Sequence, residues 1–343
     1  MDASIALALI QDGVVNGAIY ALLALSLVLV FATTRVVFIP QGEFVAFGAL
    51  TYAALDSGQT PGSLWLLAGL GACACVAGLW QQRHVPGLPL LLLAQTLALP
   101  AVVIVVALWA APLKLGVAAH AMLALAIVAP MATYIYRIAF QPLAEASVLS
   151  LLIAAVGVHM AMLGLGLAFF GPEGSRATGF ARGPVRIGDA AVPGQALWIV
   201  GLTLALMAGL FAFFGFTLRG AALRATAVNR LGARLVGISA AQSGLVAFGL
   251  AGGIGALSGI LVAPLTTVYY DSGFLIGLKG FTAAIIGGLA SYPAAVAAAV
   301  LVGLVESFSS FWASAFKEVI VFTAIIPVLL WRSLRHAVQE EDE

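Results

Sequence analysis

Three ionisable side chains, Glu43, Lys279 and Glu306, stand inside long apolar runs of this 343-residue sequence. Asp12 and Asn16 add two polar groups one helical turn apart near the N-terminus. A charge at membrane depth is costly, so such a residue usually faces protein or a water-filled path. These residues could therefore fix the packing of irregular helices, contact a transported solute, or take part in gating. We favour the packing role and keep the other two open.

Catalytic chemistry has no comparable basis in the sequence. The four histidines are far apart and form no zinc-protease pattern, and no serine stands in a nucleophile motif. The sequence contains no Walker-A phosphate loop, so any use of ATP must come from a partner. We therefore expect a protein that is not an enzyme and that binds no cofactor or metal.

The composition places these residues in a membrane protein. Charged residues make up 8% of the chain, against about 25% in typical soluble domains. Apolar residues make up 63%, and the mean hydropathy is +1.12. A soluble fold needs more polar surface, which excludes a soluble enzyme, a nucleic-acid-binding protein and a disordered chain. The sequence thus predicts an all-α polytopic membrane protein, surrounded by lipid and forming one domain over 1–343.

Continuous apolar segments recur along the chain at about the 20-residue length that crosses a bilayer. They predict about 10–11 transmembrane or broken helices. Their approximate bounds are 5–31, 36–56, 64–82, 88–110, 117–138, 148–170, 196–216, 241–263, 274–290, 293–310 and 317–333. The segments 36–56 and 274–290 are short, rich in glycine and charged, so either one could be a broken or re-entrant helix.

The positions of Lys and Arg indicate an orientation, because cytoplasmic loops are enriched in them. With the loop 217–240 in the cytoplasm, nine Lys and Arg residues fall on the inner side and five on the outer side. This arrangement places the N-terminus outside and the C-terminus in the cytoplasm. It also makes 171–195, rich in Gly and Pro, an ordered outer loop that could meet a soluble partner.

The inner loop contains a pattern typical of a short amphipathic helix over 221–236. Its apolar residues recur every four positions, at Leu223, Ala227, Leu231 and Leu235. The arginines of the same segment, Arg224, Arg230 and Arg234, lie off that stripe. Gly237 stands where a C-cap would end the helix. Two interpretations remain open: a connector held against the lipid headgroups, or a helix that docks into a cytosolic protein.

A weak similarity between two short strings of the sequence indicates two pseudo-repeats. Gly42-Glu43-Phe44 and Lys279-Gly280-Phe281 each combine a charge and a Phe near the start of a short, small-residue segment. Membrane transporters often contain two repeats whose broken helices face a path at the midplane. We therefore expect the two segments to share a structural role.

Several strings resemble the permeases of ABC importers of the branched-chain amino-acid type. The most specific is 277–288 (GLKGFTAAIIGG), and the strings of the inner loop resemble the coupling helix of that family. The other strings are 13–25, 34–38, 41–44, 170–173 and 303–306, with 224–227 and 233–238 in the inner loop. The resemblance extends over about 10–60 and 130–335, which is most of the chain.

The resemblance implies one of two permease subunits in a bacterial inner membrane. Two cytosolic ABC ATPases would drive it, and a periplasmic substrate-binding protein would deliver branched-chain amino acids or related small polar solutes. The implied ATPase-coupling residues are Arg224, Ala227, Leu231, Arg234, Leu235 and Gly237. The candidates for the translocation path are Asn16, Gln41, Glu43, Phe44, Lys279, Phe281 and Glu306. The alternative is a secondary, ion-coupled transporter of small solutes.

The chain departs from the family pattern in three places. Val228 and Asn229 stand where the family usually has acidic residues, which weakens any expectation of a salt bridge there. Gln41 stands where the family often has His. The segment 61–111 has the length of one extra hairpin, since relatives are shorter by about that much.

Overall fold

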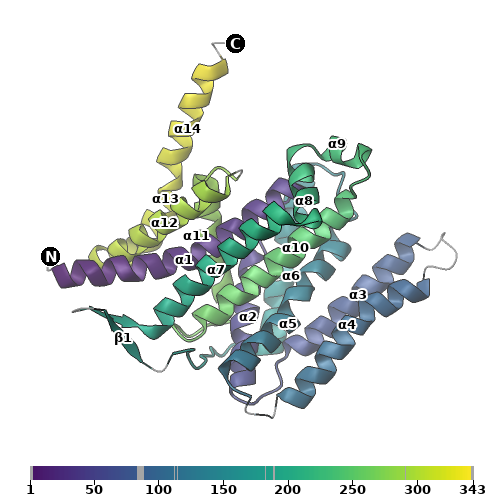
Figure 1. The fold of residues 1–343 in the computed structure, drawn as a ribbon, viewed down its shortest axis with the longest axis horizontal. Coiled ribbons are helices and arrows are strands. Elements are labelled where there is room, and N and C mark those ends of the chain that lie inside the picture. The colour runs from purple at the N-terminus through teal and green to yellow at the C-terminus, as the bar shows by residue number, and fades with distance from the viewer. Residues whose placement is uncertain are drawn as a thin grey trace.

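The protein folds as an all-α bundle in the computed structural model (Figure 1). The structure describes residues 3–82, 89–111, 113, 115–181, 183–187, 190–289 and 291–340. Within these residues eight helices are long and apolar enough to cross a membrane. The predicted all-α, polytopic fold class is confirmed.

The elements follow one another in a simple order. The helices of the N-terminal half are α1 (Ala3–Thr34), α2 (Gln41–Asp56), α3 (Ser63–Gln82), α4 (Pro89–Ala110), α5 (Val117–Ile135), extended by a π-helical turn (Tyr136–Phe140), and α6 (Val148–Phe170). An antiparallel hairpin follows, β1 (Pro184–Ile187) and β2 (Ala190–Pro193). The remaining helices are α7 (Gly194–Phe216), α8 (Leu218–Val228), α9 (Arg230–Leu235), α10 (Ala240–Val262), α11 (Ser272–Ile286), α12 (Tyr292–Trp312), a 3₁₀ turn (Ser314–Phe316), α13 (Lys317–Thr323) and α14 (Ile325–Glu340).

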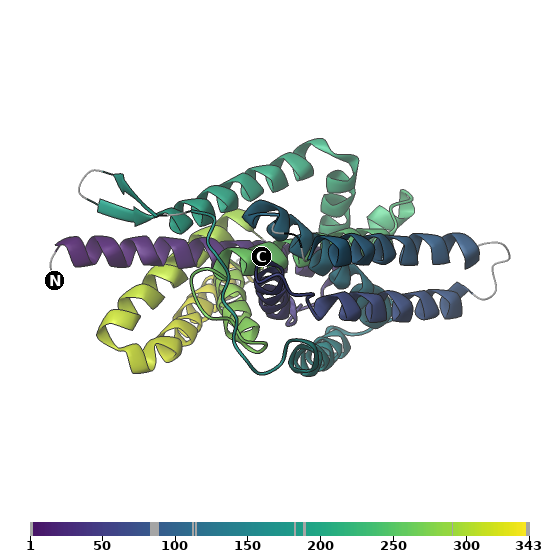
Figure 2. The same ribbon diagram turned by 90° about the horizontal axis from the view of Figure 1, so that it is seen from below.

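The core forms around α1, since residues 17–30 of this helix are all buried. Helix α1 packs against α10, α11 and α12. The start of α1 and the β-hairpin lie at one end of the bundle, and α8 and α9 lie at the other end (Figures 1 and 2). The bundle thus places the two long loops at opposite ends, as the alternation of spans predicts.

Two helices, the buried α2 and the partly buried α11, are too short to cross a bilayer alone. They contain 16 and 15 residues, or about 24 and 22 Å at the usual helical rise, against about 30 Å of hydrocarbon. They pack directly on each other, and a Cβ at Gly42 would lie 2.2 Å from the carbonyl oxygen of Gly273. Glycine at this position therefore allows the two backbones to touch.

The segment 61–111 forms the helices α3 and α4, which lie side by side at one flank of the bundle (Figures 1 and 2). The link 83–88 lies outside the described residues. The carbonyl oxygen of Thr96 on α4 accepts a hydrogen bond from the Tyr134 hydroxyl of α5 at 3.1 Å. That this pair is an addition to the family's fold stays a prediction.

The predicted loop 171–195 is tied to the ends of neighbouring helices. The Tyr52 hydroxyl donates to the Thr178 carbonyl at 2.9 Å, and the Asp56 carboxylate accepts from the Thr178 amide at 2.8 Å. Ser175 pairs with Val268 in an isolated antiparallel bridge. These bonds give the loop a defined course, and its side of the membrane stays a prediction.

The predicted span 317–333 is interrupted in the structure. A turn at Ala324 separates α13 from α14. Figure 1 shows α14 leaving the body of the bundle. Ser314–Trp331 is nevertheless one of the eight stretches that are long and apolar enough to cross a membrane, so the predicted span contains a turn that the apolar run does not reveal.

Candidate functional site

The expected single helix over 221–236 is two helices. The chain breaks at Asn229, whose backbone is extended with φ −148° and ψ 99°. Its side-chain oxygen accepts a hydrogen bond from the Gly232 amide at 2.9 Å and so begins α9. Asn is among the strongest N-cap residues, and its preference for this role overrides the continuous apolar pattern. The prediction of one uninterrupted helix was wrong at this residue.

The break divides the predicted apolar stripe into a buried and an exposed part. Leu223 is buried against Leu29 and Ala247 and so anchors α8 to the bundle. Leu231 and Leu235 on α9 are 69% and 81% exposed. We call the exposed apolar residues from the end of α8 to the residue after α9 the coupling surface: Ala227, Val228, Leu231, Leu235 and Val236.

The expected helix stop at Gly237 is confirmed. Gly237 has φ +85°, a left-handed conformation that glycine adopts without steric cost. The Gly237 amide donates to the Arg234 carbonyl at 3.0 Å, and the Ile238 amide donates to the Ala233 carbonyl at 2.9 Å. This pair of bonds is a Schellman motif, which ends α9 and turns the chain towards α10.

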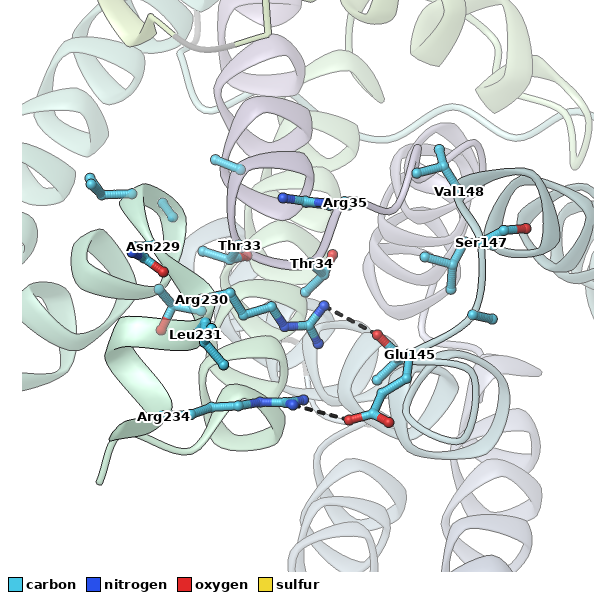
Figure 3. A pocket seen from close by; sticks show the side chains of 17 residues that line it. Thr33, Thr34, Arg35, Glu145, Ser147, Val148, Asn229, Arg230, Leu231 and Arg234 are labelled. Carbon is cyan, nitrogen blue, oxygen red and sulfur yellow. Dashed lines mark hydrogen bonds and ion pairs between the residues drawn. The ribbon is translucent and has the colours of Figure 1, made fainter. Parts of the chain in front are cut away.

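Two arginines hold α9 to the turn between α5 and α6, and one of them, Arg234, is a predicted coupling residue. Arg230 donates to the Ala144 carbonyl at 3.1 Å, and Arg234 contacts the Glu145 carboxylate at 3.0 Å (Figure 3). Arg224 on α8 is exposed. A cavity of about 570 Å³ lies between α9, this turn and the end of α1 (Figure 3).

Lys279 and Glu306 belong to one buried network. The Lys279 ammonium lies 2.5 Å from the Glu306 carboxylate and 3.1 Å from that of Glu318. The Tyr20 hydroxyl donates to Glu306. The network joins α1, α11, α12 and α13, so a single cation stabilises contacts among four helices. Tyr20 and Glu318 were not predicted, because nothing in their local sequence indicates which distant charge they meet.

Glu43 lies apart from that network, in the first turn of α2. Its carboxylate is 2.7 Å from Nδ1 of His159 on α6, and the His159 ring packs on Phe274 of α11 at a centroid distance of 4.8 Å. The sequence did not indicate that His159 meets Glu43, because the two residues lie on different helices. Lys279 stands in the middle of α11, so the expected equivalence of Glu43 and Lys279 at two helix starts does not hold.

The other path candidates make different contacts. Gln41 donates to the Ala251 carbonyl at 2.9 Å, and its side-chain oxygen is buried without a hydrogen-bond partner in the described chain. Phe44 is fully buried against Phe38. Asn16 and Phe281 are half-buried. The structure therefore assembles the predicted path residues in several places rather than in one pocket.

Comparison with known proteins identifies the family. The family described as "Branched-chain amino acid transport system / permease component" matches residues 9–330. The chain belongs to this permease family. Because the match covers α1 to α13 and the first part of α14, it includes the buried networks and the coupling surface.

Individual relatives match smaller parts of the chain. The high-affinity branched-chain amino acid transport system permease proteins LivH of Escherichia coli K12 and of Salmonella typhimurium are each 34% identical over 136 residues. That region is 39% of this chain and 44% of each LivH protein, so the chain spans less than half their length. The permease protein BraD of Pseudomonas aeruginosa is 28% identical over 205 residues, 58% of this chain and 67% of BraD. No solved structure matches the chain.

Proposed function

We propose that this protein is a transmembrane subunit of an ABC importer in a bacterial inner membrane. Together with a second permease it would form the path for branched-chain amino acids or related small polar solutes. A periplasmic binding protein would deliver the solute, and two cytosolic ATPases would supply the energy. The family match over residues 9–330 and the names of LivH and BraD support this proposal.

The coupling surface carries the proposal, because its geometry suits contact with another protein. Val228 is 88% exposed, and it lies beyond the membrane-spanning helices with Leu231 and Leu235 beside it. Leu223 and Ala233 on the opposite side are buried and fix α8 and α9 in place. An apolar surface on a fixed support is the kind of region that enters a groove in a partner. We assign the ATPase as that partner.

For the path we propose a lining that includes α2 and α11. Both helices are short and pack on each other, and α2 is buried almost throughout, as expected where short helices face protein or a cavity rather than lipid. The Glu43–His159 pair and the Lys279 network flank them and would hold their positions. In this proposal the charges stabilise the path and leave selection of the solute to other groups.

A secondary transporter is the second candidate, and one observation favours it. The chain of contacts from Tyr20 through Glu306 and Lys279 to Glu318 is the kind of intramembrane relay that proton-coupled carriers use. Membership in the permease family favours the ABC importer over this alternative. The two candidates differ in their source of energy.

Affinity purification of the tagged, full-length chain from its native membrane tests the proposed assembly. We expect two copies of ABC ATPase and a second permease to remain bound in mild detergent, with ATP hydrolysis by the purified complex. A chain that purifies alone, and transports its solute in response to an ion gradient, would identify the secondary transporter.

A further inference from the structure

The cavity beside α9 has walls from three distant parts of the sequence. They are the end of α1 at 32–35, the segment 144–151 at the start of α6, and residues 226–231 with Arg234 (Figure 3). Its volume of about 570 Å³ is in the range of small-molecule sites. Ala227, Val228 and Leu231 of the coupling surface belong to its wall, but the arginines of the cavity have no part in the docking proposed above.

The charge of the cavity is strongly positive. Its lining contains three arginines and one glutamate, which leaves a net of two positive charges. Glu145 is already paired with Arg234 at 3.0 Å. Arg35 and Arg230 have no acidic partner in the part of the chain that the structure describes, and Nε of Arg230 is buried without a hydrogen-bond acceptor there. The site thus offers guanidinium donors that lack an anion.

Arg35 supplies an independent observation. It directly follows α1 and has φ +59°, the left-handed conformation that usually selects glycine at the end of a helix. With an arginine here, the backbone is sterically strained in a way that it would not be with glycine. Strain of this kind points to a use for the side chain, and Figure 3 shows the Arg35 side chain at the wall of the cavity.

The first turn of α6 also opens on the cavity. Val148 and Leu151 line it, and Ser147 caps the helix by accepting from the Ser150 amide at 3.2 Å. The N-terminus of this 23-residue helix adds the positive end of its dipole to the two arginines. Two guanidinium groups and a helix N-terminus on one cavity are a combination suited to an oxyanion.

We propose that this cavity binds a phosphate-type oxyanion, either inorganic phosphate or the headgroup of an acidic phospholipid. One guanidinium group can donate two hydrogen bonds to a phosphate, and Arg35 and Arg230 each offer such a group. The cavity lies where α1 ends and α6 begins, so it stands at the level expected for headgroups. A bound anion would tie α9 to α1 and so set the position of the coupling surface. The proposal uses the proposed function only for that consequence and does not require the ATPase.

The test uses the full-length chain in nanodiscs of neutral phosphatidylcholine. Inorganic phosphate is titrated at constant ionic strength, and the midpoint of thermal unfolding is followed. For the native chain we expect a saturable rise. Arg35→Gly should bind phosphate about tenfold more weakly, because a charge-assisted contact is lost. Without phosphate it should unfold at the same or a higher temperature, because glycine suits the backbone at residue 35.

Arg224→Gln is the matched control, since Arg224 is exposed and does not line the cavity. A second arm uses nanodiscs that contain phosphatidylglycerol, with native mass spectrometry to detect retained lipid. Saturable phosphate binding identifies the soluble anion, and retained phosphatidylglycerol identifies the headgroup. In either case the signal should be weakened by Arg35→Gly alone.

The proposal is wrong if the native chain binds neither phosphate nor phosphatidylglycerol. It is equally wrong if Arg224→Gln weakens this binding as much as Arg35→Gly does. It is also wrong if both anion arms stay flat while Arg35→Gly weakens the complex with the ATPase. That result would assign the cavity to an acidic side chain of the partner and leave the proposed function intact. Failure of the native chain to bind any ATPase would instead contradict the proposed function, whatever the anion arms report.

Discussion

Lys279 lies between two carboxylates, and these contacts determine how its substitution would affect stability. Glu306 and Glu318 both depend on the same ammonium group, at 2.5 and 3.1 Å. Removal of one partner from a buried ion pair leaves an uncompensated charge, which is more damaging than the pair itself is stabilising. The residue is therefore better suited to holding α11, α12 and α13 together than to recognising one particular solute.

We predict that Lys279→Met destabilises the protein by about 3–5 kcal/mol and lowers transport of chemically different solutes by a similar factor. The measurements are thermal unfolding in detergent and uptake of two cargoes by reconstituted vesicles. Lys317→Met is the control: Lys317 is 41% exposed and 3.9 Å from Glu318, so its loss should cost at most about 1 kcal/mol. Loss of one cargo with normal uptake of the other would show direct recognition by Lys279.

For single residues, the sequence predicted which charged side chains lie inside the bundle better than it predicted which residues they contact. Glu43, Lys279 and Glu306 stand out because charges are rare in apolar runs, and all three are buried. Their partners come from other helices: His159 meets Glu43, and Glu318 meets Lys279. Such pairs depend on how helices pack, and no local pattern contains that information.

Among the elements, α8 and α9 are where local chemistry overrides periodicity. The spacing of Leu223, Ala227 and Leu231 fits one helix, yet Asn229 caps a second one. The break turns Leu231 and Leu235 outward while Leu223 stays buried. The proposed docking of an ATPase on this exposed part leads to a specific expectation.

Ala227→Glu should abolish uptake and solute-stimulated ATP hydrolysis while the protein still inserts into the membrane. An unpaired charge in an apolar contact costs several kcal/mol, about enough to separate a typical docking partner. Ala221→Glu places the same charge on an exposed alanine of α8 outside the coupling surface, and it should retain activity. Equal activity of both variants would make α8 and α9 a simple connector.

The contact between α2 and α11 leads to a second prediction, which concerns the packing of these two helices. At Gly42 an added Cβ would meet the Gly273 carbonyl oxygen at 2.2 Å, so the two helices must separate. We expect Gly42→Ala to lower the unfolding temperature and transport together. Gly157→Ala on α6 adds the same methyl group where no atom lies within 4 Å. It should be neutral or stabilise by up to about 1 kcal/mol, and a similar loss in both variants would contradict the close contact.

For the whole molecule, composition and hydropathy were sufficient to predict an all-α, polytopic protein, because so few charged residues leave no other class. They also marked the segments of α2 and α11 as short, but they did not show that the two helices touch at Gly42 and Gly273. The turn at Ala324 was missed for a similar reason: the apolar pattern continues through it. The side on which each loop lies rests on the distribution of Lys and Arg alone.

Thiol labelling in intact cells tests that orientation. Cys73 and Cys75 are first replaced by Ser, and one cysteine is then introduced at the exposed position Ala221 or Glu173. An impermeant reagent should label Glu173→Cys directly, and Ala221→Cys only after the membrane is opened. The reverse pattern would invert the proposed topology.

Energised uptake tests the central proposal most directly. The complex purified through the tagged chain is placed in vesicles and supplied with a binding protein, radiolabelled leucine, and either internal ATP or an imposed proton or sodium gradient. Our account predicts accumulation that requires ATP and the binding protein and that persists when the gradient is collapsed. Accumulation driven by the gradient without ATP would contradict it and would establish the ion-coupled transporter instead.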